Sequence, residues 1–203
     1  MYRSPAAFID GMVAAAARID AARDICLSLA RHWGTTSAER ERPFPCDRWL
    51  EDADDAVFRG IDVDAAAPIV FRWLCQLRAA PYSYDWIDNF GRRSPRRLTP
   101  GLDALAVGQR VMGLFEIVEF EPDRHLTIRS VAGRRLVGAV AISYLVVARG
   151  DATARILVKI LVRYPAGPLG RAARWLLPSG DLVMMRKQLL TLKALAEQSA
   201  RGR

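Results

Sequence analysis

A cluster of side chains that could hold or activate a small molecule lies at residues 81–89. The run contains two tyrosines, a tryptophan, two aspartates and an asparagine, and the candidate ligand-binding residues are Tyr82, Tyr84, Asp85, Trp86 and Asn89. Aromatic rings pack on flat apolar molecules, whereas hydroxyl, carboxylate and amide groups fix their orientation by hydrogen bonds. We therefore predict that this run lies at the mouth of a ligand site. The alternative is a helix-capping and packing unit, with Trp86 buried and an aspartate paired to an arginine.

Four further candidate ligand-binding residues come from other segments, namely Phe115, Ile117, Tyr144 and Met185. The first three lie in segments that alternate like strands, and Met185 lies with Met184 on a helical stripe. Methionine side chains adapt to irregular apolar surfaces, which suits a pocket wall. Lys159 is a secondary candidate. All of these positions also fit a purely structural role, so catalytic residues stay unassigned.

Glu116 is a second place where a carboxylate could do acid–base chemistry. If Pro122 and Asp123 form a turn, Glu116 lies opposite Arg129 on the next strand. The same register places Ile117 opposite Ile128 and Glu119 opposite Leu126. A surface ion pair worth about 0.2–1 kcal/mol accounts for Glu116 and Arg129 together. A catalytic Glu116 remains the open alternative.

Other kinds of site find no support in the sequence. The three cysteines (Cys26, Cys46, Cys75) and two histidines (His32, His125) lack the spacing of disulfides or metal ligands. No nucleophile elbow, phosphate-binding loop or dinucleotide fingerprint is present. We expect no metal and no cofactor.

Length and composition indicate a single folded domain with room for one added element. The chain has 203 residues, of which 51% are hydrophobic, and no apolar run reaches the ~18 residues needed for a membrane span. The N-terminal region is interrupted by charges and does not read as a signal peptide, so we expect a cytoplasmic protein.

The net charge of +8 is almost entirely arginine, which is typical of proteins from GC-rich, bacterial genomes. The basic residues are dispersed except at 91–97, and no nucleic-acid-binding motif accompanies them. We therefore expect no nucleic acid partner. Contact of the 91–97 cluster with a phosphate or acyl-carrier surface is left open.

The first 52 residues are expected to form an amphipathic helix and a proline-containing linker ahead of the domain. The helix is predicted over 4–33, where Ser4 is a good N-cap and apolar residues recur every three or four positions. Its apolar face must cover the sheet or a second copy, so a homodimer through this helix is one alternative. The domain itself is predicted at 53–203.

Strands and helices follow in a definite order along that domain. A strand at 57–63 leads into a helix capped by Asp64 and ending near Arg78, and a short helix is predicted at 82–90. A loop at 92–106 precedes the remaining elements. These are strands at 109–120, 124–131, 136–148 and 153–163, a short helix at 169–176, and a terminal helix from Ser179 or Asp181 to 198. A short strand near Trp49 is left open, which gives five or six strands in all.

The predicted strand at 136–148 is apolar on both faces, which indicates that both are covered. One face carries Tyr144, and the other carries the small residues Ala139, Ala141 and Ser143, which would let the N-terminal helix approach closely. Which side of the last strand faces Tyr144 depends on the length of the turn at Gly150.

The segment Ile61–Ala65 through Pro68–Leu74 resembles the opening of polyketide cyclase and START-like proteins. The segment Val107–Arg110, the hairpin Phe120–Arg124 and the late hairpin from Tyr144 to Gly150 extend the resemblance over about residues 54–198. It points to the helix-grip superfamily, also known as SRPBCC, which includes pollen allergens. The resemblance implies an α+β helix-grip fold: a curved antiparallel sheet wrapped around a long C-terminal helix, here with an extra N-terminal helix.

The resemblance also implies an internal cavity, but it supplies no universal catalytic residue. The leading hypothesis is binding of a small hydrophobic or amphipathic ligand: a lipid, an aromatic or a polyketide-like molecule. The alternative is an enzyme of the cyclase, aromatase or dehydratase type acting on such a ligand. A third hypothesis is an interaction module that docks through the N-terminal helix.

Overall fold

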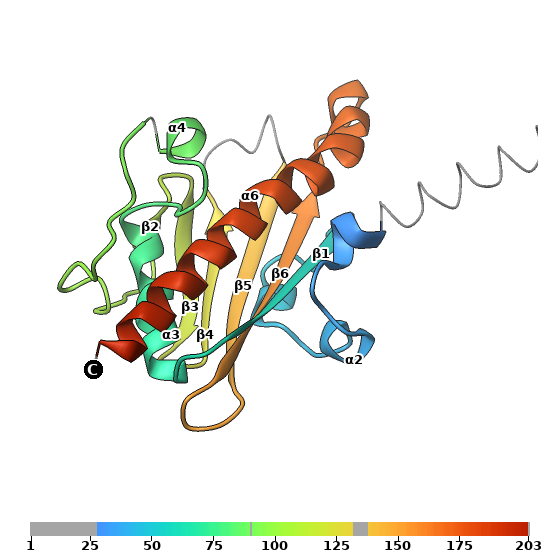
Figure 1. Cartoon of the computed structure of the whole chain (residues 1–203). Helices are drawn as coiled ribbons and strands as arrows, with labels where there is room; N and C mark the ends of the chain where they lie inside the picture. The colour runs from blue at the N-terminus through green and yellow to red at the C-terminus, as the bar shows by residue number, and fades with distance from the viewer. Residues whose placement is uncertain (1–27, 90, 132–137, 203) are drawn as a thin grey trace, which may run out of the picture.

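A six-stranded antiparallel sheet curves around one long helix (Figure 1). The computed structural model describes residues 28–89, 91–131 and 138–202, so most of the helix predicted at 4–33 lies outside the described residues. The strand order is β1-β6-β5-β4-β3-β2. The strands are β1 (Asp55–Val63), β2 (Arg110–Val111), β3 (Phe115–Glu121), β4 (His125–Ser130), β5 (Ala139–Ala148) and β6 (Ala154–Arg163). This architecture confirms the α+β helix-grip fold.

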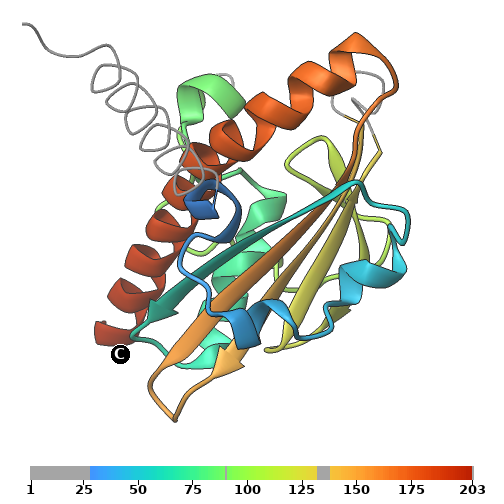
Figure 2. The same ribbon diagram turned by 90° about the vertical axis from the view of Figure 1, so that its right-hand side faces the viewer.

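The helices divide between the two faces of the sheet. The long helix α6 packs on the inner face through buried residues that include Leu189, Leu192 and Leu195, and α3 shares the same core (Figure 2). The segment 37–48, which contains the short helices α2 and η1, lies on the outer face. The described helices are α2 (Ser37–Arg40), η1 (Pro45–Arg48), α3 (Ala67–Cys75), η2 (Gln76–Arg78), α4 (Asp85–Asp88) and α6 (Pro168–Arg201).

The β3–β4 hairpin follows the predicted register over its first half only. Ile117 lies opposite Ile128 and Glu116 opposite Arg129, as predicted. The register then shifts, so that Glu119 lies opposite Thr127, and the predicted pairing of Glu119 with Leu126 is wrong. A bulge of one extra residue causes this change. It brings Glu119 to the outer face, where its carboxylate accepts a hydrogen bond from Trp49 at 3.1 Å.

The β5–β6 register decides which side chains face Tyr144. Tyr144 lies opposite Val158 and Ile142 opposite Ile160, which places the apolar alternation of both strands on the inner face. Ser143 and Lys159 form an opposed pair on the outer face. The face of β5 and β6 that carries Tyr144, Ile142, Val158 and Ile160 is therefore the one that can line a cavity.

Among the described residues, the 3₁₀ helix η1 covers the outer face of β5. The backbone N–H of Cys46 donates to Ser143 Oγ at 2.8 Å, and Phe44 and Leu50 pack in the same cluster as Ala139 and Ala141. The small side chains do allow close approach, but the segment that uses them is η1. The strand suggested near Trp49 is likewise absent from the structure, which has η1 there.

An ion-pair cluster holds α2 on the outer edge of the sheet. The Glu39 carboxylate accepts from Arg155 Nε at 2.6 Å and from the backbone N–H of Thr36 at 2.9 Å. The Arg155 hydrogen bond, chiefly, lowers the pKa of Glu39 to about 2. The chain before β1 is thus tied to β6 by a charged contact as well as by apolar packing.

The C-terminal helix is longer than expected. Two helices were predicted, at 169–176 and from residue 179 or 181 onward, but α6 runs unbroken from Pro168 to Arg201 with Pro178 inside it. Proline removes one hydrogen bond of the helix ladder, and packing against the sheet offsets that loss.

The predicted cap of α3 is also wrong: Ala66 is the N-cap, and the Asp64 N–H donates to Glu197.

Candidate functional site

A cavity of about 560 Å³ lies between the inner face of the sheet and α6. We call it the main lobe. A smaller inner lobe of about 210 Å³ adjoins it and shares Phe115, Ile142 and Asp181 with it. The main lobe is lined by Pro81, Ser83, Ile87, Asp88, Met112, Gly113, Leu114, Phe115, Ile142, Tyr144, Asp181, Met184, Met185 and Gln188. Its volume is in the range of pockets that hold small molecules.

The spacing of residues on α6 explains how one helix supplies a whole wall of the main lobe. Asp181, Met184, Met185 and Gln188 occupy positions i, i+3, i+4 and i+7, so they share one face of the helix. The facing wall is the inner surface of β3 and β5. The wall is therefore apolar along most of its length, with a polar group at each end of the helical stripe.

One polar group of the wall is a hydrogen-bonded chain that joins sheet, helix and loop. The Tyr144 hydroxyl donates to Gln188 Oε1 at 3.0 Å, and Gln188 Nε2 donates to the carbonyl of Pro81 at 2.7 Å. Burial raises the pKa of the Tyr144 phenol far above its usual value, so it stays protonated. Because the Tyr144 hydroxyl and the Gln188 amide already have hydrogen-bond partners, this network stabilises the cavity wall and offers no free reactive group.

The other polar group is an ion pair between β1 and α6. Arg59 is completely buried, and its guanidinium donates to Asp181 Oδ2 at 2.7 Å. The Asp181 side chain keeps 28% of its surface accessible and lines both lobes. Burial raises the pKa of Asp181 to about 6, although Arg59 pulls it in the opposite direction. Asp181 can therefore accept or release a proton near neutral pH at the cavity wall.

A second carboxyl lines the main lobe from the 81–89 run. Ser83 donates a hydrogen bond to Asp88 Oδ2, and the buried Oδ1 of Asp88 has no hydrogen-bond partner among the described residues. Burial, chiefly, raises the pKa of Asp88. An unpartnered buried oxygen costs free energy unless something else satisfies it. Asp88 is thus a second group that could contact a polar part of a ligand.

The structure brings together three of the nine predicted ligand-binding residues as cavity lining, namely Phe115, Tyr144 and Met185. Ile117 is buried in the core below the cavity. Tyr82 is buried edge-on against Trp73, with ring centroids 6.2 Å apart, and burial raises its pKa to about 12.

The remaining predicted residues of the 81–89 run do not line the described cavity. Tyr84 is the N-cap of α4, Asp85 accepts hydrogen bonds from Ser94, and Asn89 donates to the carbonyl of Arg92. Trp86 is 75% exposed, so the alternative in which it is buried is wrong. The run reaches the cavity through Pro81, Ser83, Ile87 and Asp88 instead.

Arg59, Asp181 and Gln188 were missed by sequence reasoning. A signal existed for Arg59, because it shares the period-two positions of Val57, Ile61 and Val63 on β1. No comparable signal marks Asp181, which lies 122 residues away from its partner.

Glu116 and Lys159 belong to the outer face. The Glu116 carboxylate lies 3.1 Å from Arg129, as the surface-pair interpretation predicts, and Lys159 lies 2.5 Å from Asp47. Burial raises the thiol pKa of Cys46 to about 11 and that of Cys75 to about 12. Within residues 28–89, 91–131 and 138–202, no three cysteine, histidine or acidic side chains gather in a geometry for a metal ion.

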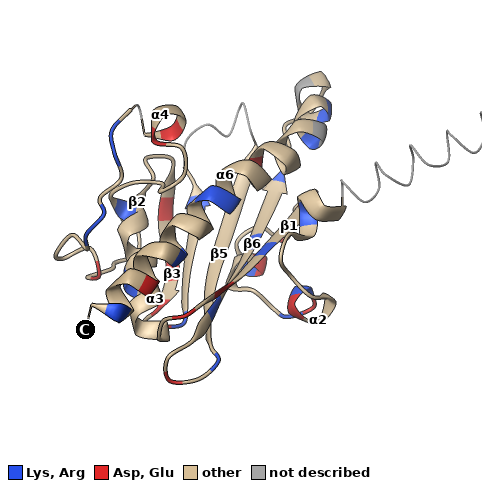
Figure 3. Ribbon diagram, in the orientation of Figure 1, with Lys and Arg blue, Asp and Glu red and all other residues tan. Residues whose placement is uncertain are grey.

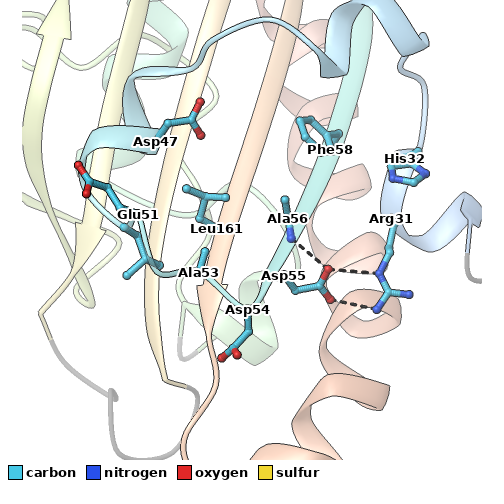
Figure 4. A pocket seen from close by; sticks show the side chains of 11 residues that line it. Arg31, His32, Asp47, Glu51, Ala53, Asp54, Asp55, Ala56, Phe58 and Leu161 are labelled. Carbon is cyan, nitrogen blue, oxygen red and sulfur yellow. Dashed lines mark hydrogen bonds and ion pairs between the residues drawn. The ribbon is translucent and has the colours of Figure 1, made fainter.

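A different hollow of about 600 Å³ opens on the outer side of β1 (Figure 4). It is rich in carboxylates, and three of the four are in ion pairs: Asp55 with Arg31 at 3.0 Å, Asp47 with Lys159 and Asp54 with Arg174. Another open groove, of about 960 Å³, lies by the β3–β4 turn. We take the two-lobed cavity as the candidate site because it alone of the three is walled by α6 and the inner face.

Comparisons with known proteins add likenesses of fold. No family model and no curated protein matches the chain. An aromatase/cyclase from Streptomyces matches at 16% identity and TM-score 0.42, over 73% of this chain and 96% of that one. Norcoclaurine synthase from Thalictrum matches at 13% identity and TM-score 0.41, over 71% of this chain and 95% of that one. A hypothetical protein from Helicobacter pylori matches at 17% identity and TM-score 0.48, over 76% of this chain and 95% of that one.

Proposed function

We propose that the protein binds a small hydrophobic or amphipathic molecule, such as a lipid, an aromatic or a polyketide-like compound, in the two-lobed cavity. The observation that carries this proposal is a hollow of about 560 Å³ between sheet and helix, where a close-packed core would otherwise be expected. Apolar side chains supply most of its walls, and burial of apolar ligand surface there would supply most of the affinity.

The polar groups at the wall would orient the ligand. Asp181 can accept a hydrogen bond from a ligand hydroxyl while Arg59 holds the carboxylate in place. Met184 and Met185 lie beside it and can adapt to the ligand's shape. An amphipathic molecule would thus place its polar end near Asp181 and its apolar part against Phe115 and Ile142.

Native mass spectrometry of freshly purified protein tests this proposal. We expect a population with added mass that a denaturing measurement removes, and extraction should yield an apolar or amphipathic compound. Soaking the delipidated protein with that compound should restore the mass at one molecule per chain. Failure of any extracted or added apolar compound to bind would overturn the proposal.

A second candidate function is acid–base catalysis on a ligand of the same class, as in a cyclase, aromatase or dehydratase. The specific observation in its favour is Asp181, whose pKa of about 6 suits a general base at neutral pH. Its carboxylate would take a proton from carbon next to a ligand carbonyl, and the proton would return to the oxygen that leaves as water.

A β-hydroxythioester of N-acetylcysteamine, which carries both the acidic α-carbon and the hydroxyl that leaves, is a suitable probe for that activity. Dehydrated product, followed by its loss of mass, should form above the uncatalysed rate with the wild type and at that rate with Asp181→Asn. The variant should still bind the ligand, since amide and carboxylate are of equal size. Equal turnover by both proteins would exclude Asp181 as the base.

Other features of the sequence prediction remain proposals. These are the division of the chain at residue 52, a homodimer through the N-terminal helix, and a cytoplasmic location. No helix in the described part of the chain is long and apolar enough to cross a membrane.

A further inference from the structure

Exposed apolar side chains occur among the residues that line the main lobe and directly beside them in the sequence. Ile87 is 51% exposed and Leu114 is 52% exposed, and both also line the lobe. Trp86 precedes Ile87 on α4, and Val183, 53% exposed, precedes the lining residue Met184 on α6. The two views show α4 beside α6 (Figures 1 and 2). We call Trp86, Ile87, Leu114 and Val183 the rim.

Basic side chains flank this rim. The loop that follows α4 carries four exposed arginines, Arg92, Arg93, Arg96 and Arg97, and Lys187 is exposed on α6 (Figure 3). Within the described residues, none of the five forms an ion pair, although most other arginines there do. Their charges are therefore available to an external partner.

The basic loop is held against the apolar part of the rim. The Asp85 carboxylate accepts hydrogen bonds from the Ser94 backbone N–H at 2.9 Å and from the Ser94 hydroxyl at 2.5 Å. Asn89 Nδ2 donates to the carbonyl of Arg92. These contacts hold the start of the basic loop against α4, the helix that carries Trp86 and Ile87.

Single exposed apolar residues are common, but an exposed tryptophan close in the chain to arginines that form no ion pair with any described residue is the pattern of an interfacial membrane contact. Tryptophan favours the boundary between lipid chains and headgroups, and arginines beside it are attracted to anionic headgroups. An acidic protein would satisfy the arginines but would leave the need to bury Trp86, Ile87 and Leu114 unexplained.

We propose that the rim and the 92–97 loop form a docking surface for an anionic lipid bilayer. Trp86, Ile87 and Leu114 would enter the interfacial layer, with the arginines on phosphate-bearing headgroups. This surface goes beyond the proposed function, because it concerns how the cavity mouth meets a bilayer and does not require a ligand inside. A ligand from the bilayer would enter the main lobe between Ile87 and Leu114.

Co-sedimentation of the full chain with vesicles tests the proposal. The probes are vesicles of phosphatidylcholine alone and of phosphatidylcholine with phosphatidylserine in equal parts. We expect binding to the mixed vesicles only, weakening as salt is raised. Arg92→Ala with Arg93→Ala should weaken binding by about 30-fold, and Trp86→Ser by about tenfold.

Matched control variants carry the same kinds of substitution at positions away from the mouth of the main lobe. Arg42→Ala with Arg124→Ala removes two exposed arginines that line the groove by the β3–β4 turn, and Val107→Ser removes an exposed apolar residue outside the rim. Both should sediment like the wild type, and thermal unfolding should be unchanged in all variants. Absence of sedimentation, or equal losses in rim and control variants, would overturn the proposal. Loss with the arginine variant but not with Trp86→Ser would overturn insertion of the rim.

Discussion

The guanidinium of Arg59 on β1 lies 2.7 Å from the carboxylate of Asp181 on α6, and the arginine is completely buried. A second donor of Arg59 reaches the carbonyl of Phe58 at 2.9 Å, while its buried Nε has no partner in the described part of the chain. The pair thus joins the sheet to the C-terminal helix at the wall of the cavity. A buried arginine is costly to desolvate, so its presence there calls for a role other than packing.

Arg59→Met should destabilise the fold by about 3–5 kcal/mol, because Asp181 would be left without its counter-charge. Asp181→Leu added to Arg59→Met should recover most of that loss, since it replaces the pair with apolar groups. Urea unfolding of the two variants measures both quantities. If the double variant recovers none of the lost free energy of unfolding, the ion pair contributes little to holding α6.

Asp181 should make the stability depend on pH. Its pKa is raised from 3.8 to about 6 in the folded state, so the folded protein binds the proton more tightly than the unfolded chain does. The contribution to stability is therefore fully present below pH 3.8 and is lost as pH rises through 6. Relative to Asp181→Asn, the wild type should lose on the order of 2 kcal/mol across this window. Urea unfolding at several pH values measures it, and a constant difference between the two proteins would contradict the raised pKa.

Glu39 should show the opposite dependence. Arg155 and the Thr36 N–H lower its pKa from 4.5 to about 2, so its contribution is present above pH 4.5 and is lost as pH falls toward 2. At neutral pH, Glu39→Gln should cost on the order of 2 kcal/mol, and the variant and wild type should converge in acid. Parallel stability curves would mean that the Glu39–Arg155 contact does not hold α2 on the sheet.

Two buried tyrosines should respond differently to loss of the hydroxyl. The Tyr82 hydroxyl is buried without a partner among the described residues, so Tyr82→Phe should leave stability unchanged or raise it by up to about 1 kcal/mol. Tyr144→Phe breaks the hydrogen bond to Gln188 and should cost about 1–3 kcal/mol. Thermal unfolding compares the pair directly. Equal effects would contradict the assigned hydrogen bonding.

The fold was largely predictable because period-two alternation and turn residues mark the longer strands of the sheet. The single strand predicted at 109–120 is instead two strands, β2 and β3, separated by a turn at 112–114. The pairs Ile117–Ile128 and Glu116–Arg129 followed from the turn at Pro122 and Asp123. The bulge before Glu119 could not be predicted, because Glu119 meets Trp49 from a segment 70 residues away. The continuity of α6 through Pro178 likewise depends on packing that local propensity does not contain.

The candidate site was only partly predictable. Phe115 could be placed on the inner face from alternation and Met185 on the apolar stripe from helical spacing, whereas the face of Tyr144 follows only from the strand register of the structure. The ion pair could not be found in this way, since Asp181 follows a proline and serine that suggested a helix start. Trp86 was attributed to a binding site from its residue type alone, and its exposure follows from the position of a one-turn helix.

Filling the main lobe tests the central claim most directly. Met184→Trp places a larger side chain at the wall of the lobe, whereas Ala194→Trp places the same side chain on an exposed position of α6. Titration with anilinonaphthalene sulfonate, which fluoresces in apolar surroundings, measures binding to each cooperatively folded protein. We predict saturable one-to-one binding to the wild type and to Ala194→Trp, and binding at least about tenfold weaker to Met184→Trp. Equal binding by the two tryptophan variants, or no binding by the wild type, would contradict the account.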